Sequence, residues 1–262
     1  MTKHTIRWHQ NISIGIMVSM VSSLLFVSVA SGGLLMDSGL KGVYESNITG
    51  SASDIGKNGD YYTVLSASLG GYKGIGGDTF VFLRANGEGY LYKRYSDLDA
   101  AIIGMSGGVY KEFNNILSAT GTLSIKRENF KDSERNSTAY GGAINLKQQV
   151  YPRLWIKEGY EFEKNKAEFD IFSYDAHLFG IWTGYSILLK TTATLGYSYL
   201  HRTYEEPAGY RNIFHTFSLG LTREIARKVA ITGSYDRQYI SSNLPAANHI
   251  DNIFALGLSY SY

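Results

Sequence analysis

Apolar and polar side chains alternate along most of the chain with a period of two. In segment 229–239 one set of alternate positions reads Val, Ile, Gly, Tyr, Arg, Tyr, and the other reads Ala, Thr, Ser, Asp, Gln. Segment 189–199 repeats the pattern, with Leu195, Tyr197 and Tyr199 on one face and Thr194 and Ser198 on the other. A period of two over about ten residues predicts a β-strand with one apolar and one polar face.

Twelve segments show this alternation, and we expect each to be a strand. They are 34–46, 61–72, 79–93, 98–110, 116–128, 137–150, 154–163, 169–182, 187–201, 212–224, 229–240 and 251–262. Long polar connections are expected at 47–60, 129–136, 202–211 and 241–250, and a turn is expected at the glycine-rich stretch 70–77. All three prolines lie in connections, as continuous strand ladders require. The regular spacing indicates an up-and-down meander.

A secreted β-sandwich is the main alternative among all-β folds. Sandwich strands are about five or six residues long, whereas these segments have the length that crosses a bilayer at a tilt of about 45°. The polar face continues along nearly the whole strand, as in Ser118, Thr120, Thr122, Ser124 and Lys126. The pattern predicts an all-β transmembrane antiparallel up-and-down β-barrel of about 12 strands, with 10 to 14 possible if hairpins are merged or split. Closure satisfies every backbone group in lipid.

The aromatic content supports the membrane interpretation. Aromatic residues make up 14% of the chain, and 21 of them are tyrosines. Amphipathic rings prefer the boundary between membrane and water, so we expect girdles of outward rings near strand ends. The expected outward rings are Tyr44, Tyr160, Phe162, Trp182, Tyr197, Tyr199, Phe217, Tyr235, Tyr239, Tyr260 and Tyr262.

The first thirty residues have the pattern of a cleavable signal peptide. Lys3 and Arg7 precede an uncharged apolar run from Ile12 to Ala30, and Ser28 and Ala30 are small residues at the positions that a signal peptidase requires. A retained membrane anchor is the alternative, because the run approaches the length of a span. We therefore divide the chain into a signal peptide, 1–30, and an outer-membrane β-barrel, 31–262.

Charge and cysteine content exclude several classes of protein. The net charge of +2 belongs to the first thirty residues, and the remainder has equal numbers of basic and acidic side chains. This balance gives no electrostatic reason to expect nucleic acid binding. The chain has no cysteine, which excludes a disulfide scaffold, cysteine-ligated zinc and covalently attached c-type haem.

The end of the chain carries an alternating aromatic and aliphatic pattern. Its apolar positions are Phe254, Leu256, Leu258, Tyr260 and Tyr262. This ending resembles the C-terminal insertion signal of Gram-negative outer-membrane β-barrel proteins, in which the last residue is usually Phe. The resemblance implies a location in the cell outer membrane of a Gram-negative bacterium. It also implies contact with the barrel-insertion machinery, outer-membrane lipid and lipopolysaccharide. More loosely, segment 42–48 and the tyrosine-rich ending resemble barrels of surface lipoprotein and exopolysaccharide export systems.

The polar face of each strand predicts the lining of the lumen. With both ends of the barrel domain in the periplasm, the longest connections lie outside the cell, as is usual for this architecture. The candidate lining residues include Lys41 and Glu45. The other candidates are Arg84, Glu88, Lys126, Lys147, Lys157, Glu161, Asp175, His177, Lys190 and Arg202. Because both signs of charge interleave, salt-bridged packing of the lumen is at least as well supported as a selective constriction.

Catalytic arrangements find little support in the sequence. His215 and Ser218 should lie on opposite faces of one strand, and Asp175 and His177 share a face but lack an adjacent nucleophile. No metal-ligand spacing is evident. We expect no enzyme activity, no cofactor and no metal. The predicted function is a small porin-like channel for small solutes, or the barrel component of a system that exports a polymer. The alternatives are a structural or adhesive barrel that binds a partner through extracellular loops, and a lipid-modifying or proteolytic enzyme.

Overall fold

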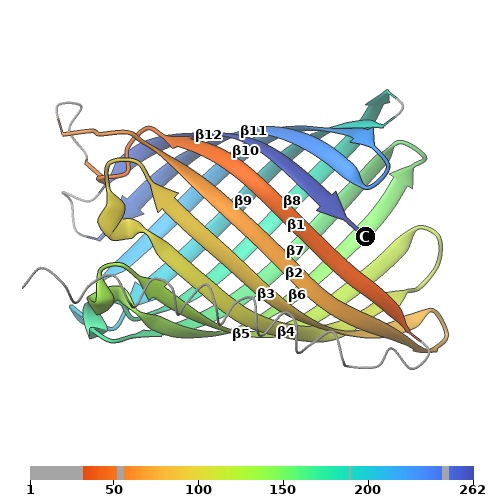
Figure 1. Cartoon of the computed structure of the whole chain (residues 1–262), viewed down its shortest axis with the longest axis horizontal. Helices are drawn as coiled ribbons and strands as arrows, with labels where there is room; N and C mark the ends of the chain where they lie inside the picture. Colours follow the sequence, from red (N-terminus) through yellow and green to blue (C-terminus); the bar gives the residue numbers. More distant parts are fainter. Residues whose placement is uncertain (1–31, 52–55, 189, 244–247) are drawn as a thin grey trace, which may run out of the picture.

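The computed structural model describes residues 32–51, 56–188, 190–243 and 248–262, which form one closed β-barrel (Figure 1). The predicted signal peptide, 1–30, lies outside the described residues. The strands are β1 (Gly33–Glu45), β2 (Asp60–Gly76), β3 (Thr79–Tyr92), β4 (Ala100–Glu112), β5 (Leu117–Phe130), β6 (Ser137–Tyr151), β7 (Leu154–Ala167), β8 (Tyr174–Leu188), β9 (Thr191–Tyr204), β10 (Arg211–Ala226), β11 (Val229–Ser242) and β12 (His249–Ser261). In the part of the chain that is described, no helix is both long and apolar enough to cross a membrane.

Every strand pairs antiparallel with its neighbours in sequence, and β1 closes the barrel against β12. The closing ladder runs from Asp37 opposite Ser261 to Glu45 opposite Ile253. In the described part of the chain, closure leaves neither β1 nor β12 as an open edge along this ladder, which is the condition for a sheet to stand in lipid. The predicted twelve-stranded up-and-down barrel is therefore confirmed.

The two ends of the barrel differ in their connections. Segments 46–59, 93–99, 131–136, 168–173, 205–210 and 243–248 connect strands at one end, which we call the long-loop end. The opposite, tight-turn end has the connections 77–78, 113–116, 152–153, 189–190 and 227–228. The stretch from 70 to 76 was wrongly expected to be a turn, because it belongs to β2. Gly70, one of its inward glycines, lets the strands approach closely: a Cβ there would lie 2.2 Å from the carbonyl oxygen of Leu83.

The predicted bounds of β8 and β9 were displaced by several residues. Residues 170–172 form a short 3₁₀ turn instead of the start of β8. Residues 183–186, which the predicted strands 169–182 and 187–201 left as a connection, belong to β8. Gly184, which lies in this segment, makes room inside the barrel for the indole of Trp155. A Cβ on Gly184 would lie 2.2 Å from that ring.

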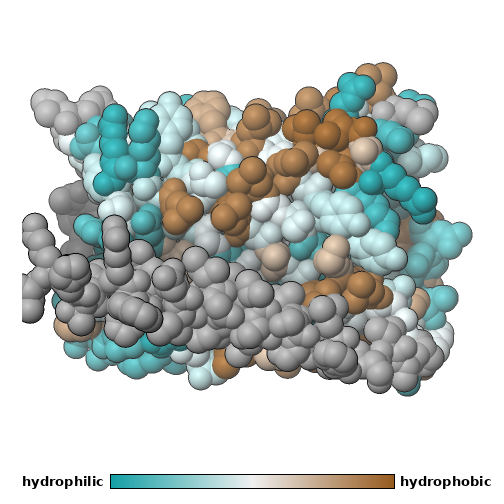
Figure 2. Space-filling view, viewed as in Figure 1, coloured by the Kyte–Doolittle hydropathy of each residue, from teal (hydrophilic) through white to brown (hydrophobic). Residues whose placement is uncertain are grey.

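Apolar side chains cover the outside of the wall. Large aliphatic residues remain exposed there, with exposed fractions of 74% for Leu123 and 65% for Leu256. Figure 2 shows hydrophobic residues gathered over the wall and hydrophilic residues towards the two ends. The few buried apolar residues are small or medium in size: Val43, Ala139, Ala167, Ala176 and Ile240. This arrangement inverts that of a water-soluble domain and suits a barrel surrounded by lipid.

Paired rings lie on the outer face, as the alternation predicts. Tyr44 packs against Tyr61 and Tyr235 against Phe254, with ring centroids 4.7 and 4.8 Å apart. Trp182 is an exception, because its ring lies inside the barrel with Lys157, whose Nζ is 5.5 Å from the ring centroid.

Glycines explain the inward position of Trp182. A Cβ on Gly180 or Gly196 would lie 2.0 or 2.4 Å from its ring, so only glycine leaves the space that the indole occupies. The inward face of β8 is therefore almost as apolar as its outward face. For this reason the two faces of β8 were assigned the wrong way round from the sequence.

Candidate channel lumen

The inward faces of the strands bring together most of the predicted lining residues. Residues opposite each other in an antiparallel ladder share a face, so the register fixes which side chains point inward. The candidates on the inward faces are Lys41, Glu45, Arg84, Glu88, Lys126, Lys147, Lys157, Glu161 and Arg202.

Two predicted lining residues, Asp175 and His177, lie on the outer face of β8. Asp175 forms an ion pair with Lys164 of β7, at 3.4 Å. His177 contacts the hydroxyl of Tyr160 through Nδ1, at 2.9 Å, and packs beside Phe162. The assignment of both to the lumen was wrong, and the reason is the reversal of faces in β8. Their position near the long-loop end permits polar groups on the outer surface.

Lys190 is also not a lining residue of a strand. It lies between β8 and β9 and has a positive φ of 65°. Because β9 begins at Thr191, later than predicted, Lys190 lies at the tight-turn mouth.

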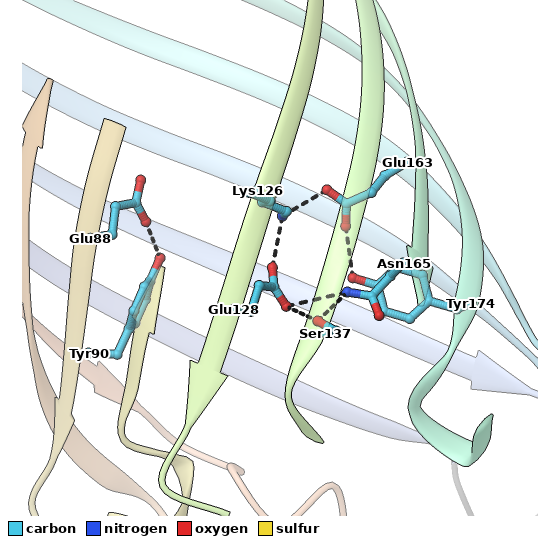
Figure 3. A network of polar contacts seen from close by, with 8 residues as sticks. All are labelled: Glu88, Tyr90, Lys126, Glu128, Ser137, Glu163, Asn165 and Tyr174. Atoms are coloured by element: carbon cyan, nitrogen blue, oxygen red, sulfur yellow. Dashed lines mark hydrogen bonds and ion pairs between the residues drawn. The ribbon is translucent and has the colours of Figure 1, made fainter. Parts of the chain in front are cut away.

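A polar network occupies the wall between β5 and β8 (Figure 3). The ammonium of Lys126 lies 3.0 Å from a carboxylate oxygen of Glu128 and 2.8 Å from one of Glu163. Glu128 also accepts hydrogen bonds from Ser137 Oγ and Asn165 Nδ2, at 3.0 and 3.3 Å. One cation thus serves two carboxylates.

The same network continues to an aromatic side chain. Tyr174 donates a hydrogen bond from its hydroxyl to Glu163, at 2.8 Å. The guanidinium of Arg202 lies 4.1 Å from the centroid of the Tyr174 ring. This cation–π contact helps to hold the guanidinium of Arg202 in place.

Nearer the tight-turn end, basic side chains have individual partners. Arg84 forms an ion pair with Asp37, at 3.3 Å. Lys147 lies 5.4 Å from the ring centroid of Trp155, and Lys157 is held similarly over Trp182. These contacts hold the cations beside other inward side chains of the wall.

Sequence reasoning missed the inward tyrosines of β2 and β3. The ring of Tyr62 lies 4.6 Å from that of Tyr92 and 6.4 Å from that of Tyr90. Tyr90 donates a hydrogen bond to Glu88, at 2.7 Å. The available signal was parity, since Tyr90 and Tyr92 share the alternate set of Arg84 and Glu88. That set was treated only as a charged face.

Two buried carboxylates, also missed, hold the loops at the long-loop end. Asp60 is 1% exposed and accepts hydrogen bonds from the backbone N–H groups of Tyr61, Arg94 and Tyr95, at 2.8, 2.9 and 3.1 Å. Asp251 accepts from Ser46 Oγ and from the backbone N–H of Asn47, both at 2.9 Å. Asp60 is the first residue of β2 and Asp251 the third residue of β12. Their partners lie in loops, so neither acid stands out in the alternating pattern.

Space remains inside the barrel. A cavity of about 520 Å³ lies against the outer wall beside Tyr160 and Phe179, but another, of about 600 Å³, is lined mainly by inward residues. The lining of the second includes Lys41, Tyr62, Glu88, Tyr90, Ser234 and Asp236. This is the chemistry of a water-filled lumen and not of a hydrophobic core.

The candidate catalytic groups remain apart. The ladder between β10 and β11 places His215 outward and Ser218 inward, as predicted. Another histidine and acid pair, His249 and Asp251 on β12, faces inward, where Asp251 is engaged by the loop residues already described. Among the described residues, no group of three or more metal-ligating side chains lies close enough to hold an ion.

Comparisons with known proteins place the architecture among outer-membrane channels. No protein-family model and no curated protein sequence matches the chain. An outer membrane channel from Pseudomonas putida F1 matches with a TM-score of 0.67 and 7% identity, over 90% of this chain and 97% of that one. The chain has the fold of a porin-like outer-membrane β-barrel.

Two porins show the same similarity at low sequence identity. The NanC porin matches with a TM-score of 0.57 and 14% identity, over 85% of this chain and 98% of that one. The KdgM porin, solved in complex with oligogalacturonate, matches with a TM-score of 0.53 and 10% identity, over 86% and 99% of the two chains. The similarity therefore spans nearly the whole barrel.

Proposed function

We propose that the protein is a channel in the outer membrane of a Gram-negative bacterium and that small polar solutes cross through its lumen. The single observation that carries this proposal is the cavity of about 600 Å³ among polar inward side chains. The porin and channel structures that share the fold give further support. Twelve strands about 4.8 Å apart, tilted by about 40°, enclose a backbone diameter on the order of 24 Å, which leaves room for a narrow aqueous path.

The orientation of the barrel follows from its connections. Outer-membrane barrels have short periplasmic turns and longer extracellular loops. We therefore assign the long-loop end to the cell exterior and the tight-turn end to the periplasm. The first residue of β1, Gly33, and the last residue of β12, Ser261, then both lie at the periplasmic mouth.

The outer wall is proposed to contact membrane lipid, lipopolysaccharide and the insertion machinery. Phe254, Leu256 and Leu258 point outward on β12, with exposed fractions of 50%, 65% and 46%. The final residue, Tyr262, is held by a backbone hydrogen bond from its N–H to the carbonyl of Met36, at 2.8 Å. Because β12 presents these apolar side chains at the seam with β1, it is suited to be recognised by the insertion machinery before the seam closes.

Conductance in a planar lipid bilayer tests the channel function. Purified, detergent-solubilised protein should insert and produce discrete current steps, because the lumen contains water-accessible polar groups. A folded barrel that inserts without current over a range of voltages would contradict the proposal. In that case the adhesive, export-component and enzymatic alternatives would be preferred, since none of them requires a freely conducting lumen.

A further inference from the structure

We propose that the channel is cation-selective and that it favours small organic cations over anions of similar size. This proposal rests on the proposed channel function and deepens it by naming the class of solute. Its basis is an uneven distribution of charge along the lumen. The half of the lumen that is richer in carboxylates also contains aromatic side chains.

Carboxylates dominate the half of the lumen nearer the long-loop end. Among the described residues, the inward acids of this half are Glu45, Asp60, Glu88, Glu128, Glu161, Glu163, Asp236 and Asp251. The inward basic residues of the same half are Lys41, Lys126 and Arg202. Acids therefore outnumber bases by eight to three in this part of the described chain. Glu45 and Asp251 share a hydrogen bond through their carboxyl groups, so this pair carries about one negative charge.

The other half of the lumen shows no such surplus. In the described residues its inward bases are Arg84, Lys147 and Lys157, and its inward acids are Asp37, Glu112 and Glu224. The negative field is therefore concentrated towards the mouth that we assign to the cell exterior. A solute arriving from outside meets this half first.

Local pairing accounts for only part of these acids. Lys126 lies between Glu128 and Glu163, and Arg202, which stands over the rings of Tyr174 and Phe214, also interacts electrostatically with Glu163, so this cluster is close to neutral. Glu88 and Asp236, which line the cavity of about 600 Å³, lie outside this cluster. A narrow lumen lined by one sign of charge concentrates counter-ions and excludes ions of the same sign.

Three of the carboxylates are placed to act on passing solutes. Glu88 and Asp236 line the cavity of about 600 Å³ from opposite sides of the closing seam. Glu161 is an exposed inward residue of β7. No ion pair with a basic side chain is formed by any of these three carboxylates in the described part of the structure.

Tyrosine rings give the lumen a second, independent preference, which is for organic cations. Tyr62 and Tyr90 line the same cavity as Glu88 and Asp236. The faces of aromatic rings attract ammonium groups. An organic cation makes a larger contact area with the rings than a small metal ion does. Carboxylates and rings together are thus suited to a small organic ammonium ion, while the same surface repels a carboxylate or phosphate.

Reversal potentials in a planar bilayer test the proposal. Under a tenfold KCl gradient, we expect the wild-type channel to pass K⁺ at least about threefold more readily than chloride, from the charge of its lumen. The triple variant Glu88→Gln, Glu161→Gln, Asp236→Asn should reduce this ratio by about twofold or more. The single variant Asp236→Asn, which touches no hydrogen bond described above, provides a milder change if the triple variant fails to fold.

Glu158→Gln is the matched control. Glu158 lies on β7, three residues from Glu161, but on the outer face between Leu146 and Ile181. It changes the total charge as Glu161→Gln does, so selectivity should remain at the wild-type value. A loss of selectivity in this control would show that net charge, and not the lumen, sets the ratio, and would overturn the inference.

Replacing KCl with choline chloride tests the organic cation directly. Current carried by choline should persist in the wild type and fall at least about twofold in the triple variant. An absence of any conductance contradicts the channel function itself. Conductance with no preference for cations, or with a preference that the triple variant leaves unchanged, overturns only the inference on selectivity.

Discussion

Replacing Lys126 with methionine should destabilise the barrel through the two carboxylates that the lysine serves. Methionine keeps most of the length of the side chain and removes its charge. Glu128 and Glu163 have side-chain exposed fractions of 11% and 17%, so neither can fully recover its hydration in place. Their mutual repulsion would then act without an intervening cation.

The expected magnitude follows from the contacts that are lost. The ammonium makes two short contacts with carboxylates, at 3.0 and 2.8 Å. A hydrogen bond to a charged group contributes about 1.5–3 kcal/mol, and breaking a buried ion pair costs about 3–5 kcal/mol. Because water in the lumen screens part of the repulsion, we expect the free energy of unfolding to fall by about 3 kcal/mol.

Urea unfolding in lipid vesicles, followed by tryptophan fluorescence and by heat-modifiable gel migration, measures this change. The triple variant Lys126→Met, Glu128→Gln, Glu163→Gln should recover most of the lost stability, because it removes the unpaired charges together with the cation. A change below about 0.5 kcal/mol for Lys126→Met would refute the reasoning, since that is the range of ordinary surface substitutions. Failure of the triple variant to recover would also contradict it.

Three further changes test other parts of the structure. Glu158→Leu should raise the free energy of unfolding by about 1–2 kcal/mol in vesicles, because it removes a carboxylate from the lipid-facing wall. Gly184→Ala should lower it by about 1–3 kcal/mol, because the added Cβ meets the ring of Trp155. Asp60→Ala should speed trypsin cleavage after Arg94 in the intact barrel, because it leaves three backbone N–H groups without their acceptor.

Each of these changes has a control within the chain. Glu161→Leu alters the inward face of the same strand as Glu158 and should give no gain in stability. Gly89→Ala adds a Cβ where nothing lies within 4 Å and should cost less than Gly184→Ala. For Asp60→Ala, unchanged cleavage at Arg94 would show that the carboxylate does not hold segment 93–99.

Period-two alternation was sufficient to predict the twelve strands and their closure. It succeeds in a lipid-exposed barrel because almost every outward position must be apolar, as in segment 229–239, where β11 begins at the predicted residue. It failed in β8 because Gly180 and Gly184 admit indole rings into the lumen. Alternation then distinguishes the two faces poorly, and Asp175 and His177 were assigned to the wrong side.

The contacts within the lumen were less accessible to sequence reasoning. The inward parity of Lys126 could be predicted, but its partner Glu163 lies on a different strand, and only the register of three strands brings them together. The surplus of carboxylates near the long-loop end likewise depends on the depth of each residue in the barrel. Asp60 and Asp251 bind loop backbone, for which a sequence has no period.

The most direct test of the central claim is blockage of the current by a thiol reagent at one lumen position. The chain has no cysteine, so Ser218→Cys, on the inward face of β10, would carry the single thiol. A bulky, water-soluble methanethiosulfonate should lower the single-channel current of this variant and leave unchanged that of Leu219→Cys, whose side chain faces outward. Equal effects on the two variants, or no current from either folded barrel, would contradict the account of a solute channel through the lumen.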